Sequence, residues 1–527
     1  MEEFQMTLNL IEPDTCYRPS PFWSWNDKLD ESELRWQVQQ MHKAGLGGFF
    51  MHARGGLKTA YLSKEWLSCI KACLDEAKKL GMNAWLYDEN GWPSGFGGGI
   101  VNGLGVKYQQ KYLVGKWIKT QDFVPGKEII AIYSQKDLTL LPNHIIPTDY
   151  SQDMIYQMSY DINPFYVDNL DKRVVAKFIE VTHDFYYKNL PKNLLSALRG
   201  IFTDEPQLSR RGCLWSFILE DEYTKAYQTN LLNDLPHLLL DTSKSNLIRN
   251  RFWKLITRLF SENFLKQIQE QCKKYNWQLT GHHVLEERFS NQIPSNGAVM
   301  AQYQYYDIPG MDILGRFAPD TVAMKQLEST ANQTGKKQIL TESFACTGWN
   351  FNFYGMKWHY QIQLAHGINY LCQHLHAYSL KGMRKRDYPG SWGTYMPQWE
   401  DYKVMNDRFS RIGMLISNGK ISNNVLVMHP ISSAWKLYHG NDNDMYLNLY
   451  YDSLNMLSTY LDGEHASYHY ADEQLVEQFG SFEDGKIKIG EMSYSLLVIP
   501  QATNFSRKMF QLMKAYKADS PKNKIIV

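Results

Sequence analysis

The chain has 527 residues, of which 44% are hydrophobic and 21% are charged. These proportions exclude the disordered and fibrous classes, and the length predicts two to four domains or one large barrel with additions. Because 56 Lys and Arg oppose 55 Asp and Glu, the formal net charge is only +1. We therefore expect neither a nucleic acid nor an anionic membrane as a partner.

The N-terminal sequence and the cysteines bear on localisation. The segment MEEFQMTLNLIEPD has no basic region followed by an apolar one, so no secretory signal is visible, and no apolar stretch reaches the ~18 residues of a membrane span. The seven cysteines are odd in number and scattered, as is typical of free thiols in the cytoplasm. We expect a cytoplasmic protein, with the loss of an export signal as the alternative.

Short apolar runs alternate with helical patterns through most of the first 415 residues, which predicts a parallel α/β fold. The predicted strands are 17–25, 47–53, 83–89, 200–205, 277–283, 308–314, 338–344 and 369–377. The predicted helices are 30–44, 63–80, 171–189, 247–275, 320–335 and 355–366, the first two capped by Asp30 and Ser63. Eight βα units in order predict a (β/α)8 TIM barrel over residues 1–415.

Two segments interrupt this alternation, and a third follows it. Residues 104–165 are β-rich and predict an insertion after the third strand, and residues 206–246 predict a partly helical insertion after the fourth. From residue 416 a strand–helix pattern restarts and predicts a small open α/β domain of Rossmann-like type over 416–527. Because its last strand has only begun at residues 525–527, we expect this domain to be truncated and the chain to be a piece of a longer protein.

Two glutamates follow strand ends that would meet at the mouth of the barrel. The fourth strand ends in Thr-Asp204-Glu205-Pro, and the seventh in Thr-Glu342-Ser. Barrel enzymes keep their active sites at this face, and two carboxylates there can flank a glycosidic bond, one as acid and the other as base or nucleophile. The structural alternative for either glutamate is an ion pair that closes the barrel mouth.

Other polar and aromatic side chains at predicted strand ends are candidates for binding a sugar. The second strand ends near His52 and Arg54, and the third runs into Asp88, Glu89 and Trp92. Hydrogen bonding to hydroxyl groups explains several histidines, and tryptophans at the rim can form the walls of a pocket. The further candidates are Trp23, Trp25, Asp204, His282, His283, Trp349, His376 and Trp392.

A metal-dependent hydrolase is an alternative because histidines gather at the strand ends. His52, His282, His283, His374 and His376 could converge on a metal ion. That kind of site needs an H-x-H pair on the first strand, whereas the pair here, His374 and His376, lies on the eighth. Sugar binding explains His282, His283 and His376 with fewer assumptions, and core packing remains an alternative for His374.

The long motifs PFWSWNDKLDESELRWQVQQMHKAGLGGFFMHARGG and LGMNAWLYDENGWPSGFGGG, together with FTDEP and LTESF, resemble the N-terminal barrel of glycoside hydrolase family 106 and its uncharacterised bacterial relatives. The resemblance covers roughly residues 17–415. It implies an inverting α-L-rhamnosidase with Glu205 as general acid and Glu342 as general base. It also implies calcium as a cofactor, for which Asp88, Glu89, Glu286, Glu287, Asp307 and Asp312 offer oxygens.

The sequence thus predicts a glycoside hydrolase that removes a terminal deoxysugar from a carbohydrate substrate. The leading candidate for this sugar is α-L-rhamnose. The alternative enzyme activity is that of a retaining β-glycosidase, such as a β-galactosidase, in which Glu342 is the nucleophile. A catalytically silent carbohydrate-binding protein is the alternative of another class. The oligomeric state and the position of any calcium site stay open.

Overall fold

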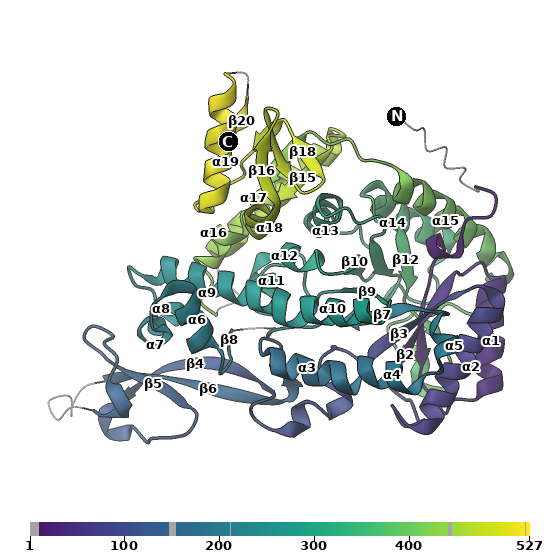
Figure 1. The fold of residues 1–527 in the computed structure, drawn as a ribbon, viewed down its shortest axis with the longest axis horizontal. Helices are drawn as coiled ribbons and strands as arrows, with labels where there is room; N and C mark the ends of the chain where they lie inside the picture. The colour runs from purple at the N-terminus through teal and green to yellow at the C-terminus, as the bar shows by residue number, and fades with distance from the viewer. Residues whose placement is uncertain (1–9, 147–153, 211, 441–444, 522) are drawn as a thin grey trace.

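The computed structural model describes residues 10–146, 154–210, 212–440, 445–521 and 523–527 (Figure 1). Its largest element is a parallel sheet in the order β12-β11-β10-β9-β7-β3-β2-β1-β13. Strand β1 pairs with β13 in parallel, and β12 and β13 are successive pieces of one segment, so the sheet closes as an eight-stranded barrel. The predicted (β/α)8 fold is confirmed. The strands are β1 Phe22–Trp25, β2 Gly48–Ala53, β3 Asn83–Asn90, β7 Leu198–Asp204, β9 Gln278–His282, β10 Ile308–Ile313, β11 Leu340–Ser343, β12 Tyr370–Gln373 and β13 His376–Ala377.

Helices follow each strand and cover the outside of the barrel (Figure 1). The predicted caps form, because the Asp30 carboxylate accepts hydrogen bonds from the amides of Ser32 and Glu33, and the Ser63 hydroxyl accepts one from Trp66. The covering helices are α1 Glu31–Lys43, α2 Lys64–Leu80, α3 Lys172–Val181, α4 His183–Asn189, α5 Lys192–Leu195, α9 Ser245–Phe260, α10 Gln267–Lys274, α11 Phe289–Asn296, α12 Met300–Tyr303, α13 Thr321–Gln333, α14 Phe353–Ala365 and α15 Tyr402–Asn418. A π-helical turn, Ser261–Lys266, joins α9 to α10.

The barrel has two distinct apolar layers. Its interior holds a cluster to which most strands contribute, made of Phe22, Phe50, Trp85, Tyr87, Phe202, Ile308, Leu340, Tyr370, Cys372 and Leu375. A larger cluster fills the space between the strands and the surrounding helices. Because successive residues of a strand point to opposite faces, each strand contributes to both layers.

The two predicted insertions meet in one antiparallel sheet of order β5-β6-β4-β8 (Figure 1). Strands β4 Gln109–Lys119, β5 Ile129–Ser134 and β6 Met154–Val167 come from the first insertion, and residues 147–153 of it lie outside the described residues. Strand β8 Cys213–Trp215 comes from the second and pairs with β4. The second insertion continues in α6 Leu219–Tyr227, α7 Leu231–Asp234 and α8 Pro236–Leu239.

The C-terminal elements form a parallel sheet of order β15-β14-β19-β20 beside an antiparallel one of order β16-β17-β18. The Gln333 amide of α13 donates to the carbonyl of Tyr470 (2.9 Å), so this part of the chain contacts the barrel directly. Its elements are β14 Val425–Met428, α16 Ile431–Trp435, α17 Met445–Gly463, β15 Tyr468–Ala471, α18 Glu473–Phe479, β16 Gly480–Glu483, β17 Lys486–Ile489, β18 Met492–Tyr494, β19 Leu496–Val498, α19 Arg507–Asp519 and β20 Ile525–Ile526. The domain boundary at 415/416 and the truncation stay predictions.

All seven cysteines are free thiols. Among the described residues, none of the helices combines the length and the apolar character that crossing a bilayer requires.

Candidate functional site

A cavity opens where the barrel strands end, and four carboxylates line it. Its lining residues are Arg54, Trp92, Asp204, Glu205, Asp312, Leu314, Glu342, His374 and Tyr388. Parallel strands deliver these side chains to one edge of the sheet, because the carboxyl ends of all strands lie at the same end of a barrel. The cavity thus collects residues from chain segments more than 300 positions apart.

The carboxylate cavity is small, at about 50 Å³, whereas a larger groove of about 720 Å³ lies between α6, α9, α12 and α18. The charged groups of the larger groove pair with one another, as Lys254 does with Glu477 (2.5 Å) and Arg258 with Glu262 (3.3 Å). None of the predicted site residues lines it. We therefore place the chemistry at the barrel mouth rather than in the larger groove.

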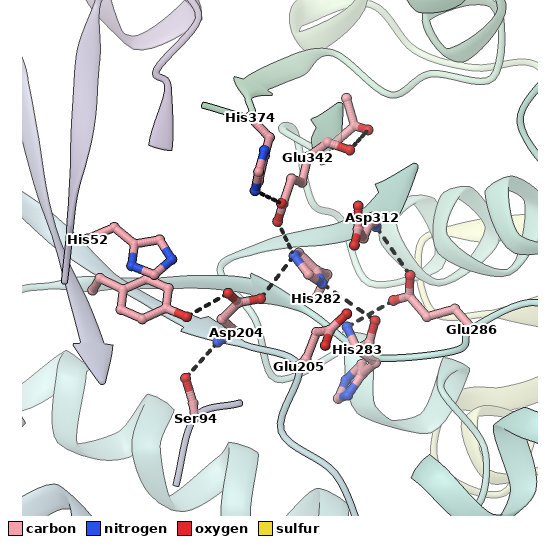
Figure 2. A network of polar contacts seen from close by, with 12 residues as sticks. His52, Ser94, Asp204, Glu205, His282, His283, Glu286, Asp312, Glu342 and His374 are labelled. Carbon is pink, nitrogen blue, oxygen red and sulfur yellow. Dashed lines mark hydrogen bonds and ion pairs between the residues drawn. The ribbon is translucent and has the colours of Figure 1, made fainter. Parts of the chain in front are cut away.

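His282 bridges two of the carboxylates (Figure 2). Its Nε2 lies 2.7 Å from Oε2 of Glu342 and 3.3 Å from Oδ1 of Asp204, and its Nδ1 faces the carbonyl of His283 at 3.4 Å. Both ring nitrogens face acceptors, so both carry a proton and the ring is an imidazolium. Burial alone lowers the pKa of His282, but the hydrogen bond and charge of Glu342 and the charge of Asp204 outweigh burial and raise it.

The imidazolium favours the carboxylate form of Glu342. Burial raises the pKa of Glu342 above its ordinary value, and the hydrogen bond and charge of His282 limit that rise without reversing it. His374 Nε2 lies 3.7 Å from Oε1 of Glu342 and 3.4 Å from a guanidinium nitrogen of Arg54, which donates to it. Glu342 is therefore a buried side chain that is oriented by the hydrogen bond from His282, while the Nε2 of His374 accepts from Arg54 and donates nothing to Glu342.

Glu205 has a different environment from Glu342. It follows β7 directly with a left-handed backbone (φ +45°), a strained conformation of the kind that gathers at functional sites. Its Oε2 lies 3.3 Å from a guanidinium nitrogen of Arg210. Burial, and next the charge of Asp204, raise the pKa of Glu205 to about 7. A carboxyl group with such a pKa holds its proton near neutral pH and can donate it.

Arg54 joins two loops at the cavity mouth. It forms two hydrogen bonds of 2.9 Å to the Asp387 carboxylate, one from Nε and one from Nη2. Its guanidinium also lies over the rings of Trp92 (5.3 Å) and Tyr388 (5.6 Å), and these rings meet edge to face at 6.1 Å. Trp92 and Tyr388 are 41% and 37% exposed, so both offer aromatic surface to a ligand.

His52 and Asp88 lie behind the cavity rather than on its wall, although the sequence predicted both to bind substrate. The His52 ring stacks on Tyr87 at 3.7 Å and accepts a hydrogen bond from Arg54 (3.2 Å). Asp88 accepts a hydrogen bond of 2.5 Å from the Ser94 hydroxyl. Tyr87 in turn donates to Oδ2 of Asp204 (2.6 Å), so this layer supports the carboxylates.

Glu89, which the sequence predicts to bind substrate, is instead surrounded by backbone amides. Its Oε2 accepts hydrogen bonds from the amides of Gly95 (3.2 Å), Phe96 (2.9 Å) and Gly97 (2.7 Å). Its Oε1 accepts from the amides of Asn90 (2.8 Å) and Gly98 (2.5 Å). A carboxylate enclosed by five amides orders the loop that carries Trp92, and it has no oxygen left for a ligand.

Three tryptophans and two histidines that the sequence predicts to bind substrate lie outside the cavity lining. Trp23 and Trp25 are fully buried in the outer layer, where Trp25 contacts Trp66 at 4.9 Å. Trp392 packs on Phe344 and Phe351. His283 packs among Phe260, Tyr303 and Tyr306, and His376 contacts Trp399. Trp349 is 53% exposed but does not line the cavity.

Sequence reasoning missed four residues that line the cavity, Asp312, Leu314, His374 and Tyr388, and also Asp387, which pairs with Arg54. Asp312 was named only as a possible calcium oxygen, although it ends the predicted sixth strand just as Glu342 ends the seventh. His374 was assigned to core packing or a metal site. Tyr388 and Asp387 lie in the loop after the last strand, and no periodic signal marks their positions.

One group of side chains at the cavity has the residue types of a metal site. In the described residues, the one group of three whose ligand atoms converge is Asp204, His282 and Glu342, all within 4.8 Å of one another. Calcium prefers six to eight oxygen ligands, and an imidazolium that already bonds both carboxylates offers no lone pair. This group therefore does not fit calcium, and the calcium cofactor stays an untested prediction.

Comparison with solved structures shows the fold of known glycoside hydrolases. The structure of a rhamnosidase from Novosphingobium sp. PP1Y matches with a TM-score of 0.70 at 12% identity, covering 97% of this chain and 68% of that one. A GH42 β-galactosidase from G. stearothermophilus (0.55, 11% identity, 95% and 71% covered) and a β-galactosidase from Bacillus circulans sp. alkalophilus (0.54, 10%, 92% and 68%) are also similar. Neither a protein-family search nor a search of curated proteins finds a match.

The chain therefore has a TIM-barrel fold that is shared with glycoside hydrolases. At these identities the likeness concerns the fold alone, so membership in glycoside hydrolase family 106 stays a prediction.

Proposed function

We propose that the protein is a glycoside hydrolase in which Glu205 is the general acid and Glu342 the general base. The observation that carries the proposal is the contrast between two glutamates of one cavity. Burial raises the pKa of Glu205 to about 7, whereas Glu342 is hydrogen-bonded to an imidazolium. Hydrolysis of a glycosidic bond needs one carboxyl group that gives a proton and one carboxylate that accepts one.

In this mechanism Glu205 protonates the leaving oxygen as the glycosidic bond breaks. Glu342 takes a proton from the water that attacks the anomeric carbon. The imidazolium of His282 holds Glu342 ionised and oriented until that step, and Asp204, bound by Tyr87 and His282, raises the proton affinity of the adjacent Glu205. Trp92 and Tyr388 would contact the apolar face of the sugar at the mouth.

The finer proposal is a terminal α-L-rhamnose as the substrate and inversion at the anomeric carbon. Its support is the sequence resemblance to an α-L-rhamnosidase family, together with a higher TM-score against the rhamnosidase than against the two β-galactosidases. Retention on a β-galactoside is the alternative, and the stereochemistry of the product separates the two.

A panel of aryl glycosides, including α-L-rhamnoside and β-D-galactoside, tests the proposal with the wild type, Glu205→Gln and Glu342→Gln. Hydrolysis of at least one glycoside, reduced by about 10²-fold or more in each variant, supports it. Sugar binding without turnover in the wild type would instead identify a carbohydrate-binding protein and overturn the assignment as an enzyme.

A further inference from the structure

Asp312 is set apart from the other three carboxylates of the cavity. Glu342 is bonded to His282, Asp204 to Tyr87 and His282, and Glu205 to Arg210. In contrast, Oδ1 of Asp312 is buried and no side chain or amide in the described residues bonds to it. A buried oxygen without a partner costs free energy, so its retention calls for a ligand.

The backbone places the Asp312 side chain beside Glu342 in the cavity (Figure 2). Asp312 on β10 and Glu342 on β11 are register partners in neighbouring parallel strands. The amide of Asp312 donates to Oε2 of Glu286 (3.4 Å), whose Oε1 accepts from the Tyr303 hydroxyl (2.9 Å). Glu286 and Tyr303 thus hold the backbone at the end of β10. The side chain of Asp312 faces the space between the proposed acid and base (Figure 2).

The charges around Asp312 favour a neutral ligand group. The cations of the cavity are already paired, since Arg54 holds Asp387 and His282 holds Glu342 and Asp204, so an anionic ligand would meet carboxylates without a free cation. Burial and the charge of Glu342 raise the pKa of Asp312, which favours its protonated form. A hydroxyl group both donates and accepts, so it pairs with this side chain whether the proton is present or not.

We propose that Asp312 binds a hydroxyl group of the sugar that occupies the cavity, as a recognition residue distinct from the acid and the base. The inference rests on the proposed function, because it takes the ligand to be a sugar. It assigns Asp312 an effect on affinity and on the choice of sugar, not on proton transfer.

The test compares Asp312→Leu, which has similar volume and no hydrogen-bonding group, with Asp312→Asn, which keeps one donor group and one acceptor. Asp161→Asn, on an exposed position of β6, is the matched control. Dissociation constants are measured by calorimetry for L-rhamnose, D-galactose and their methyl glycosides. KM, kcat and Tm are measured in parallel, the kinetic constants on any aryl glycoside that the wild type hydrolyses.

We expect Asp312→Leu to raise both KM and the dissociation constant about tenfold or more, with kcat within about threefold and Tm unchanged or raised. Asp312→Asn should recover most of the affinity. In a series of monodeoxy sugars, one analogue should bind the wild type about tenfold more weakly than its parent, and Asp312→Leu should not distinguish the two.

Unchanged affinity in Asp312→Leu, or weaker binding with a lower Tm in both variants, would overturn the inference. If the protein hydrolyses a glycoside and its sugar affinity does not depend on Asp312, this inference alone is refuted. If sugar binding depends on Asp312 but no glycoside is hydrolysed, only the proposed function is refuted. If none of the four sugars binds and no glycoside is hydrolysed, both fail.

Discussion

His282 and Glu342 are joined by a hydrogen bond of 2.7 Å, although 60 positions separate them in the sequence. The bond crosses the barrel mouth from β9 to β11, over the intervening β10. Because the other ring nitrogen of His282 also faces an acceptor, the ring is protonated and its charge favours the ionised form of the proposed base. The local electrostatics of the site therefore centre on this histidine.

Replacing His282 with Gln should move the acid limb of the pH–rate profile to higher pH. Without the imidazolium, burial and the charge of Asp204 are opposed only by the weaker effect of the Arg54 charge, so the pKa of Glu342 rises and it is ionised only at higher pH. We expect a shift of about one unit or more in the profile of kcat/KM. The control is His283→Gln, whose ring faces away from the cavity. An acid limb that does not move in His282→Gln would refute this role.

Replacing Glu205 with Gln should stabilise the fold above neutral pH. The pKa of Glu205 in the folded state, about 7, is above its value in an unfolded chain, so the favourable contribution of its proton is complete at pH 4 and is lost as the pH rises through 7. Gln is neutral throughout, so the variant should gain about 1–3 kcal/mol in free energy of unfolding at pH 8 relative to pH 4. Urea denaturation at both pH values measures it. An identical difference between wild type and variant at both pH values would contradict the raised pKa.

Trp25 and Trp92 should respond oppositely to replacement by Ala. Trp25 is fully buried between strand and helix, so its removal should cost about 3–5 kcal/mol of unfolding free energy. Trp92 is 41% exposed at the cavity, so Trp92→Ala should cost about 1 kcal/mol or less while KM rises. Denaturation and steady-state kinetics on the same two variants distinguish core from pocket wall. If Trp25→Ala were stable and bound sugar more weakly, the sequence prediction that Trp25 binds substrate would hold after all.

Glu89→Gln should destabilise the loop that carries Trp92. The carboxylate accepts hydrogen bonds from five amides, and Gln offers one acceptor oxygen and an NH2 group that faces donors. We expect a loss of about 2–4 kcal/mol in free energy of unfolding, measured by denaturation against the exposed control Glu128→Gln. An unchanged stability with weaker sugar binding would mean that Glu89 contacts the ligand after all.

The sequence predicted the barrel well because its signals are local. Apolar runs and caps such as Asp30 and Ser63 mark strands and helix starts, and the polar residues that end the strands mark the mouth. The face that each residue presents was not predictable in the same way. In FWSW, Phe22 points into the barrel and Trp23 points out, but a strand buried on both faces shows no alternation of polarity.

The histidines show the same limit. In β12, Tyr370 and Cys372 point into the barrel, and His374 continues this alternation to the cavity. The strand then breaks before β13, so His376 faces Trp399 although it lies only two positions further along. Partners from distant loops, such as Asp387 with Arg54, depend on the closure of the barrel and carry no local signal.

The most direct test of the account follows the anomer of the released sugar by proton NMR while the protein cleaves an aryl α-L-rhamnoside, with Glu342→Gln in parallel. Inverting hydrolysis by Glu205 and Glu342 predicts that β-L-rhamnose appears first and that the variant releases none. Initial release of α-L-rhamnose, or release by Glu342→Gln at the wild-type rate, would contradict it.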